Sequence, residues 1–386
     1  MKKVFLTGCD EYDRATLRKK IETGLADIGI APDDFKNARV ALKPNLLNAS
    51  PVEKAVVTHP EFFRALVDTV KSYGGAPVLV ESPAFQSLEK VVSKTGYDAI
   101  IRDERIPVWN NRDTVVAHNP SARKYRRFEI AAPLADADII INLPKFKTHE
   151  ITYITAAVKN LFGVIPGLNK SQWHVRAKTK SEFSEFLLDL YGAIMSEFSA
   201  SKKIVHIADA VIGMEGAGPG ASGTPRHIGA IVAGVDAIAV DFVLAAIVGI
   251  DSAKVTTITS GAARGLGSAS FDDIDICGGR ISDFSIKGFQ PPKTGIADVV
   301  KNWSLERDIM KNLLVERPFP VEGTCTLCYQ CKKICPVGAI GMADAPRRVP
   351  LYDYSKCIRC YCCMEICPEA AIRLKRGKLQ WLMDRA

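Results

Sequence analysis

The sequence CTLCYQCKKICP, residues 325–336, recurs 32 residues later as CIRCYCCMEICP, residues 357–368. Each copy contains four cysteines with the spacing C-x2-C-x2-C-x3-C, and a proline follows the last of them. Three closely spaced thiolates can bind one side of an iron–sulfur cubane, and in two-cluster proteins the other copy supplies the fourth thiolate. The repeat therefore predicts two [4Fe–4S] clusters. The predicted ligands of one cluster are Cys325, Cys328, Cys331 and Cys367, and those of the other are Cys357, Cys360, Cys363 and Cys335.

This repeat is typical of a bacterial-type ferredoxin module, which we expect to fold as a small α+β domain at residues 321–386. Zinc is the alternative for paired cysteines, but eight cysteines in a doubled pattern with both prolines fit a zinc site poorly. We interpret Cys362, which lies beside a predicted ligand, as a small packed thiol, with an additional ligand or a redox-active thiol as alternatives. We expect Cys9 and Cys277 to be ordinary buried cysteines.

The chain is long and apolar enough for two or three domains, with 386 residues of which 47% are hydrophobic. Its net charge of +8 could indicate nucleic-acid binding, but the basic residues are spread along the chain and no recognition motif is present. Residues 321–386 carry five more basic than acidic side chains. We expect this excess to balance the negative charge of the clusters, so nucleic acid is not an expected partner.

The sequence contains no segment that resembles a membrane span or a secretory signal. The apolar stretch at residues 237–250 contains Asp241 and is shorter than the roughly 20 residues that a span requires. The N-terminus lacks the apolar core of a signal peptide. Nine of the eleven cysteines lie between Cys325 and Cys367, which favours ligands in a reducing compartment over disulfides. We therefore expect a cytoplasmic protein.

Short β-branched runs alternate with helical patterns through residues 1–290, and this alternation predicts one large α/β domain built on a parallel sheet. A linker with an amphipathic helix at residues 296–314 is predicted for residues 291–320. The predicted strands are residues 3–7, 38–43, 77–81, 138–143, 203–208 and 228–235, and the predicted helices are residues 15–28, 60–73, 88–97, 152–162, 180–198 and 237–248. A polar stretch at residues 102–128 and a glycine-rich loop at residues 213–223 interrupt the alternation.

Several motifs in the large domain resemble a widespread prokaryotic family. They are ALKPNLL at 41–47, VTHPEFFRALVD at 57–68, ESP at 81–83, INLPKFKTH at 141–149, AVKNLFG at 157–163 and IADAVIGMEGAGP at 207–219. Together they are similar to domain of unknown function 362, over about residues 40–251. Members of that family are often fused to a C-terminal ferredoxin. The resemblance implies the two-part architecture and leaves the reaction open.

Polar side chains cluster where predicted strands end. In open parallel sheets the carboxyl ends of the strands form the usual binding crevice, so we expect these side chains to converge on an anionic small molecule or organic cofactor. The predicted binding residues are Lys43, Asn45, Lys145, Lys147, Lys159, Asn160 and Glu215. The predicted catalytic residues are Lys43, Glu81, Lys145, His149 and Asp209, of which the acids and the histidine would handle protons or, for the acids, bind a cation. The alternative for any one lysine is a solvated surface charge.

Three further segments have two interpretations each. The glycine-rich loop could bind phosphate through its N–H groups or act as a mobile lid, and it matches neither common phosphate-binding motif. Thr58 is the predicted N-cap of the following helix, with Glu61 in its first turn, so His59 is interpreted as structural. Lys170 and His174 either extend the binding crevice or lie on a surface loop.

These features together predict a ferredoxin-dependent oxidoreductase. It would exchange single electrons with a redox partner protein and act on an anionic ligand in the α/β domain. Two alternatives remain open. The protein could be an electron carrier without its own chemistry, or a non-redox enzyme whose clusters are structural or sense oxygen. Homo-oligomerisation is compatible with all three functions.

Overall fold

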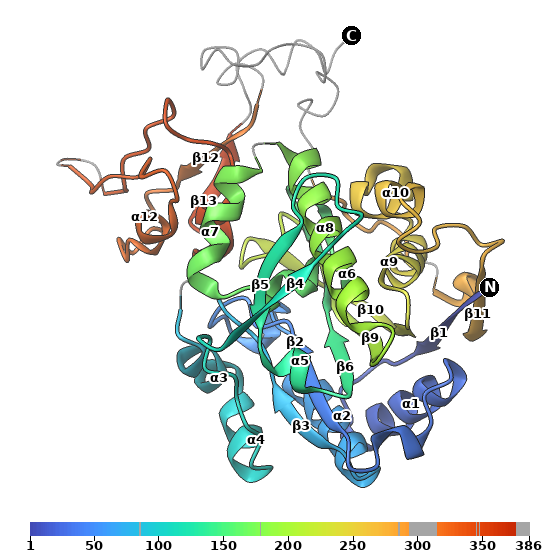
Figure 1. Cartoon of the computed structure of the whole chain (residues 1–386). Coiled ribbons are helices and arrows are strands. Elements are labelled where there is room, and N and C mark those ends of the chain that lie inside the picture. The colour runs from blue at the N-terminus through green and yellow to red at the C-terminus, as the bar shows by residue number, and fades with distance from the viewer. Residues whose placement is uncertain are drawn as a thin grey trace.

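The computed structural model describes residues 1–375 with the exception of residues 85, 178, 285, 293–314, 345 and 347. A nine-stranded sheet forms the centre of the large domain (Figure 1). Its main path runs β11 (Ile274–Gly278), β1 (Lys2–Gly8), β10 (Gly223–Gly234), β9 (Lys203–Gly216), β6 (Ile139–Leu143), β2 (Arg39–Pro44) and β3 (Ala76–Leu79). In addition, β7 (Lys145–His149) pairs with β9, and β8 (Tyr153–Thr155) pairs with β7. Most neighbouring strands are parallel, so the predicted α/β fold class is confirmed.

Helices cover both faces of this sheet, because successive side chains of a strand point to opposite sides. In β1, Val4 and Leu6 belong to one hydrophobic core and Phe5 to the other. The helices on the Phe5 side are α1 (Arg14–Asp27), α2 (Pro60–Ser72), α3 (Leu88–Thr95) and α4 (Tyr97–Asp103). Those on the other side include α6 (Ala157–Asn160), α8 (Lys180–Phe198), α9 (Ala237–Ile247) and α10 (Thr256–Ala263).

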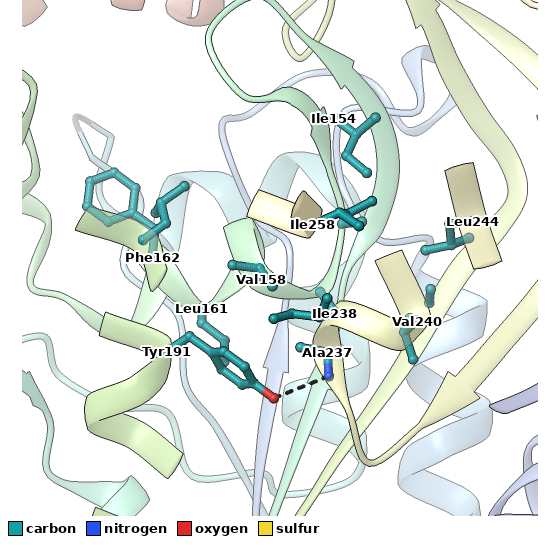
Figure 2. Packing of buried hydrophobic residues seen from close by; sticks show 14 of the residues in the cluster. Ile154, Val158, Leu161, Phe162, Tyr191, Ala237, Ile238, Val240, Leu244 and Ile258 are labelled. Carbon is teal, nitrogen blue, oxygen red and sulfur yellow. Dashed lines mark hydrogen bonds between the residues drawn. The ribbon is translucent and has the colours of Figure 1, made fainter. Parts of the chain in front are cut away.

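The helix α9 is almost entirely buried and packs against α6 and α10. The N–H of Ala237 at its start donates to the hydroxyl of Tyr191 in α8 at 3.3 Å (Figure 2). The carboxylate of Asp241, inside α9, accepts hydrogen bonds from the backbone N–H groups of Ala157 at 2.5 Å and Val158 at 3.2 Å. Burial raises the pKa of Asp241 to about 7, and these two bonds oppose that rise. A buried carboxylate thus fixes the start of α6, the helix that carries two of the predicted site residues.

Four sequence predictions differ from the structure. The helix predicted at residues 152–162 begins as strand β8 and continues as the short α6 and a 3-10 turn, Leu161–Val164. The polar stretch 102–128 contains β4 (Thr114–His118), which pairs with β5 (Arg127–Ala131). The glycine-rich segment is the tip of an antiparallel hairpin of β9 and β10, in which residues 213–216 and 223 belong to the strands and residues 217–222 form the turn. Because β10 is antiparallel to both β1 and β9, the sheet is mixed and not wholly parallel.

The ferredoxin module contains β12 (Arg317–Pro320) paired with β13 (Ile372–Lys375), and two short helices, α12 (Gln330–Ile334) and α13 (Cys362–Ile366). Both cysteine loops have the same backbone. Leu327 and Tyr329 in the first loop, and Arg359 and Tyr361 in the second, all adopt left-handed φ angles between 55° and 61°. The sequence repeat is therefore also a structural repeat. The helix predicted at residues 296–314 lies outside the described residues.

The module packs closely on the large domain through α13. The side chain of Asn48 donates to the backbone oxygen of Glu365 at 2.9 Å, and Gln86 donates to Gln330 at 3.1 Å. A Cβ atom on Gly220, in the turn between β9 and β10, would lie 2.6 Å from that same backbone oxygen of Glu365. A glycine is therefore required there for the turn to approach α13.

Candidate functional site

A cavity that is partly open to solvent lies between the large domain and the ferredoxin module. Its polar lining comes from strand ends and from the α6–α7 region, where α7 spans Gly167–Arg176. These polar residues are Asn45, Glu81, Ser82, Lys147, Thr155, Lys159, Asn160, Lys170 and His174. The module contributes Ile334, Cys362, Glu365 and Ile366. Two parts of the chain that are far apart in sequence thus enclose one site.

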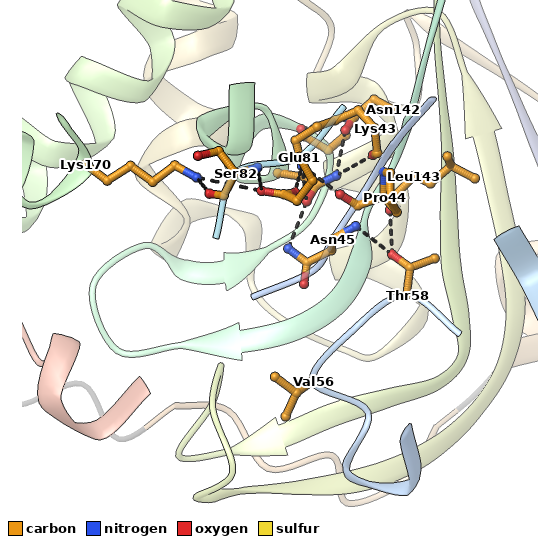
Figure 3. Close-up of polar contacts among 12 residues, drawn as sticks. Lys43, Pro44, Asn45, Val56, Thr58, Glu81, Ser82, Asn142, Leu143 and Lys170 are labelled. Atoms are coloured by element: carbon orange, nitrogen blue, oxygen red, sulfur yellow. Dashed lines mark hydrogen bonds and ion pairs between the residues drawn. The ribbon is translucent and has the colours of Figure 1, made fainter. Parts of the chain in front are cut away.

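A continuous line of polar contacts passes through Lys43, whose ammonium binds Glu81 directly (Figure 3). The same ammonium donates to Asn160 at 3.3 Å. Asn45 donates to Asn160 at 2.8 Å and accepts from Lys147 at 2.8 Å. These contacts connect three strand ends with α6, as the strand-end argument predicted for these residues. A carboxylate oxygen of Glu81 also lies 3.7 Å from the ammonium of Lys170, so Lys170 is one end of the line and Lys147 is the other.

The segment AVKNLFG ends at Gly163, whose backbone packs against the Lys43 side chain. A Cβ atom on Gly163 would come within 2.3 Å of the Lys43 side chain and 2.5 Å of the Glu81 carboxylate. No side chain fits in that space. Close approach of the backbone at Gly163 is therefore part of how the Lys43–Glu81 pair is held.

Thr58 fixes the loop that follows β2, and it is not the N-cap that the sequence predicted. Its hydroxyl accepts from the backbone N–H of Asn45 at 2.9 Å and donates to the carbonyl of Leu143 at 2.8 Å (Figure 3). The N-cap of α2 is His59, whose Nδ1 accepts from the N–H of Glu61 at 3.2 Å. The hydroxyl of Thr58 is instead used to join the ends of β2 and β6.

His149 is neutral and presents a proton toward the module. Its Nδ1 accepts the backbone N–H of Ile151 at 3.0 Å, so the proton of the neutral ring lies on Nε2. Nε2 lies 3.4 Å from a carboxylate oxygen of Glu365. Burial holds the pKa of His149 well below its usual value, and nearby positive charges lower it further, with Lys159 having the largest effect among them. The neutral ring can therefore donate a hydrogen bond from Nε2, and it does not carry a stable charge.

The lysines of the cavity are poorly compensated. In the described residues, the hydrogen-bond acceptors of Lys147 are neutral, namely Asn45 and the carbonyl of Val56, each at 2.8 Å, and the charge of Glu365 acts on it without forming an ion pair. Within the described residues Lys159 has no hydrogen-bond or ion-pair partner, and its ammonium lies 4.9 Å from the ring centre of Phe162. Burial lowers the pKa of Lys147 and that of Lys170 to about 7, and it lowers the pKa of Lys159 as well. An anion in the cavity would stabilise all three ammonium groups.

This electrostatic setting predicts how anion binding depends on pH. Below pH 7 Lys147 and Lys170 are charged in the free protein, and above pH 7 they are neutral and must take up protons to bind an anion. The affinity for sulfate, which remains a dianion throughout, should therefore fall between pH 7 and 9 by at least about tenfold per pH unit. Calorimetry at constant ionic strength measures this. Lys147→Met combined with Lys170→Met should flatten the profile, and an unchanged slope in that variant would contradict the assignment.

Three predicted site residues lie elsewhere. Asp209 accepts hydrogen bonds from Lys145 at 2.9 Å and from the hydroxyl of Tyr12 at 2.8 Å, and Lys145 also donates to Tyr12 at 2.7 Å. This cluster is buried and does not line the cavity. Glu215 accepts the backbone N–H of Gln290 at 3.0 Å, and it too lies outside the lining.

Breaking the buried ion pair between Lys145 and Asp209 is expected to have a large effect on stability. Asp209→Ala leaves the Lys145 ammonium without a carboxylate in the core, and removing one partner of a buried pair costs about 3–5 kcal/mol. We expect the free energy of unfolding to fall by that amount in urea denaturation. Asp68→Ala removes the carboxylate of the more exposed pair with Arg14 and should cost less than about 1 kcal/mol. Equal losses in the two variants would contradict a compensating role for Asp209.

The eight repeat cysteines surround two cavities in the ferredoxin module. One is lined by Cys325, Cys328, Cys331 and Cys367, and the other by Cys335, Cys357, Cys360 and Cys363. Backbone N–H groups point at the remote sulfurs, from Ala339 to Cys335 at 3.1 Å and from Ala371 to Cys367 at 3.3 Å. Four thiols around an enclosed volume, with N–H donors to the sulfurs, fit a cubane. In the described residues, no three or more His, Cys, Asp or Glu side chains are arranged to hold a single metal ion.

Cys362 is buried between two cavities. It lines the second cysteine cavity and also the cavity lined by Lys147, Lys159 and Lys170, which we call the lysine cavity. Its thiol points toward the carbonyl of Cys360 at 3.7 Å. The second cysteine cavity is therefore the one adjacent to the lysines.

Residues 318–368 match the family described as a 4Fe-4S dicluster domain. With the cysteine geometry, this match defines an iron–sulfur protein with an electron-transfer role. Residues 40–246 match the domain of unknown function DUF362, and the chain belongs to that family. Among the described residues, none of the helices combines the length and apolarity needed to cross a membrane.

The chain is similar to the thylakoid-associated protein sll1697 of Synechocystis sp., with 33% identity over 272 residues that cover 69% of this chain and 80% of that protein. It is also similar to two solved structures, the lactate racemase apoprotein from Thermoanaerobacterium thermosaccharolyticum and a protein from Thermotoga maritima. Their identities are 15% and 13%, and their TM-scores are 0.39 and 0.37. These matches cover 62% and 60% of this chain, and only 56% and 57% of the two structures.

Sequence reasoning missed Glu365, Ser82 and Thr155 as parts of the site. One signal was available for Glu365. The corresponding position in the first cysteine repeat is Lys333, so the second repeat carries a charge reversal at the residue that enters the lysine cavity. No comparable signal marks the two hydroxyl residues, because small polar side chains are common wherever strands end.

Proposed function

We propose that this protein is a ferredoxin-linked oxidoreductase that binds an anionic small molecule or organic cofactor between its two domains. One observation carries the proposal: the lysine-lined cavity and the second cysteine cavity share Cys362. A ligand held by the lysines would therefore lie beside a cluster-binding loop. A protein that only carried electrons between partners would have no need of such a cavity at this position.

In this proposal the two crossed sets of four cysteines hold the clusters, as their grouping around two cavities supports. When bound, [4Fe–4S] clusters supply single electrons at potentials set by their surroundings. A redox partner protein exchanges electrons with the module. Cys328, which belongs to the set away from the lysine cavity, is exposed and suits that exchange.

The large domain positions the ligand. Lys147, Lys159 and Lys170 bind its negative charge, while the Lys43–Glu81 pair and Asn45 hold the lysines in place. His149 lies outside the cavity lining, and its neutral ring presents the Nε2 N–H to Glu365 at the boundary with the module, so we assign it a positioning role for that carboxylate. Both carboxylate oxygens of Asp209 are engaged by its own cluster, so we assign it a structural role.

Anaerobic purification followed by iron and sulfide analysis, visible and EPR spectra before and after dithionite, and mass spectrometry of released small molecules tests this function. We expect about eight irons per chain and a co-purifying anion that is reduced under these conditions. Eight irons with no ligand, and no binding of sulfate, would favour an electron carrier. A ligand that turns over with the clusters held oxidised would favour a non-redox enzyme.

A further inference from the structure

Two hydroxyl groups of the lysine cavity have no hydrogen-bond partner in the part of the chain that the structure describes. They are Ser82 Oγ and Thr155 Oγ1, and both atoms are buried. Their residues are 1% and 4% exposed and line the cavity. A buried hydroxyl without a partner is costly, and native proteins rarely keep one unless something else satisfies it.

The two hydroxyls lie at opposite ends of the line of polar contacts. Thr155 is the direct cross-strand neighbour of Lys147 in the β7–β8 pair. Ser82 lies beside Lys170, whose ammonium binds the Ser82 carbonyl (Figure 3). Between these ends run Asn45, Asn160, Lys43 and Glu81, each in contact with the next. Each end therefore contains one ammonium group and one buried hydroxyl that has no partner among the described residues.

The charges of the cavity call for two negative charges. Among the described residues, two carboxylates face the four ammonium groups of Lys43, Lys147, Lys159 and Lys170: Glu81 forms ion pairs with Lys43 and Lys170, and the charge of Glu365 acts on Lys147 and Lys159. Within the described residues, neither Lys147 nor Lys159 lies within ion-pair distance of a carboxylate. Buried charges are stable only when they are paired, so two ammonium groups remain to be neutralised by a ligand.

The cavity lining also contains apolar side chains. Leu46, Leu47 and Phe162 come from the large domain, and Ile334 and Ile366 come from the module. A cavity whose lining combines two separate ammonium and hydroxyl pairs with apolar side chains suits a ligand that combines two polar groups with apolar carbon.

We propose that the ligand is a dianion with two separate acceptor groups joined by an apolar spacer, such as an α,ω-dicarboxylate. Lys147 and Thr155 bind one acceptor group, and Lys170 and Ser82 bind the other. This inference rests on the proposed function, because it specifies the ligand of the same cavity. It excludes compact dianions such as phosphate as the best ligands, since these do not carry two separate acceptor groups.

Calorimetry with the full-length protein at pH 6.5 tests the inference, with succinate, glutarate and adipate as probes. The matched probes butyrate, valerate and hexanoate have the same chain lengths and one carboxylate each. We expect at least one dicarboxylate to bind about tenfold or more tightly than its monocarboxylate. Sulfate is included as a compact dianion.

Ser82→Ala and Thr155→Val identify the two ends. Each variant should lower the affinity for the best dicarboxylate by about tenfold, because a hydrogen bond to a charged acceptor is lost. A monocarboxylate should respond to one variant and not the other. Both variants should fold normally, since each removes a buried hydroxyl that has no partner, and their melting temperatures verify this.

The outcomes separate the two proposals. Sulfate binding that depends on Lys147, without any advantage for dicarboxylates or any effect of the hydroxyl variants, overturns the dianion inference and leaves the anion site of the proposed function intact. If none of these anions binds, both proposals fail.

Discussion

Replacing Lys147 and Lys159 together with methionine is expected to weaken anion binding by at least about 100-fold. Each substitution removes a charge-assisted interaction of about 1.5–3 kcal/mol, and every 1.4 kcal/mol corresponds to a factor of ten. Neither lysine lies within ion-pair distance of a carboxylate in the described residues, but both act on the charge of the buried Glu365, so the melting temperature of the double variant is measured as well. Methionine keeps the length and apolar body of the side chain. Calorimetric titration with succinate and with sulfate at pH 6.5 measures the change.

The matched control is Lys19→Met combined with Lys254→Met. Both of these lysines are exposed and lie outside the cavity lining, and the net charge changes by the same amount. The control should retain nearly all of the affinity. Iron and sulfide content should stay at the wild-type level in both double variants. Equal weakening in the two variants would mean that the anion responds to overall charge, and the cavity would lose its assigned role.

A second large effect concerns which cysteines act together. If Cys335 and Cys357 belong to one cluster, Cys335→Ala combined with Cys357→Ala removes that cluster alone, and iron falls from about eight to about four per chain. Cys325 and Cys335 line different cavities, so the variant that lacks both should lose nearly all of its iron. Iron analysis and the EPR spectrum of the dithionite-reduced protein report both results.

The opposite pattern would show that each repeat holds its own cluster with its own four cysteines. In that case the Cys325 and Cys335 pair would retain about four irons, and the Cys335 and Cys357 pair would lose them all. Cys362→Ala serves as the control, because this thiol bonds to a backbone carbonyl and is expected to be no ligand. Its iron content should remain at about eight.

The cysteine repeat and the alternation of strands and helices could be predicted from the sequence because both depend on local spacing. Thiolate spacing is set by the geometry of one loop, and the alternation reflects which side chains each element buries. The helix α8 was predicted with its observed limits, Lys180–Phe198. The hairpin of β9 and β10 was missed, because glycine-rich strands carry a weak local pattern and are stabilised by their neighbours in the sheet.

The site was predictable in part for the same reason. Parallel strands end at one edge of a sheet, so the sequence indicated that Lys43, Glu81 and Lys147 would lie near one another. It could not indicate which polar partner each side chain would meet. Lys145 lies two residues before Lys147 on the same strand, yet it is neutralised by Asp209 in a separate buried cluster.

Local sequence therefore determined the elements, the cluster-binding loops and the set of strand-end residues from which a site could be built. The tertiary structure alone decided that the site lies against the ferredoxin module, with Glu365 and Cys362 in its wall and with the hydroxyls of Ser82 and Thr155 lacking partners among the described residues. Burial and hydrogen bonding are properties of groups brought together from distant parts of the chain. No pattern within one segment records them.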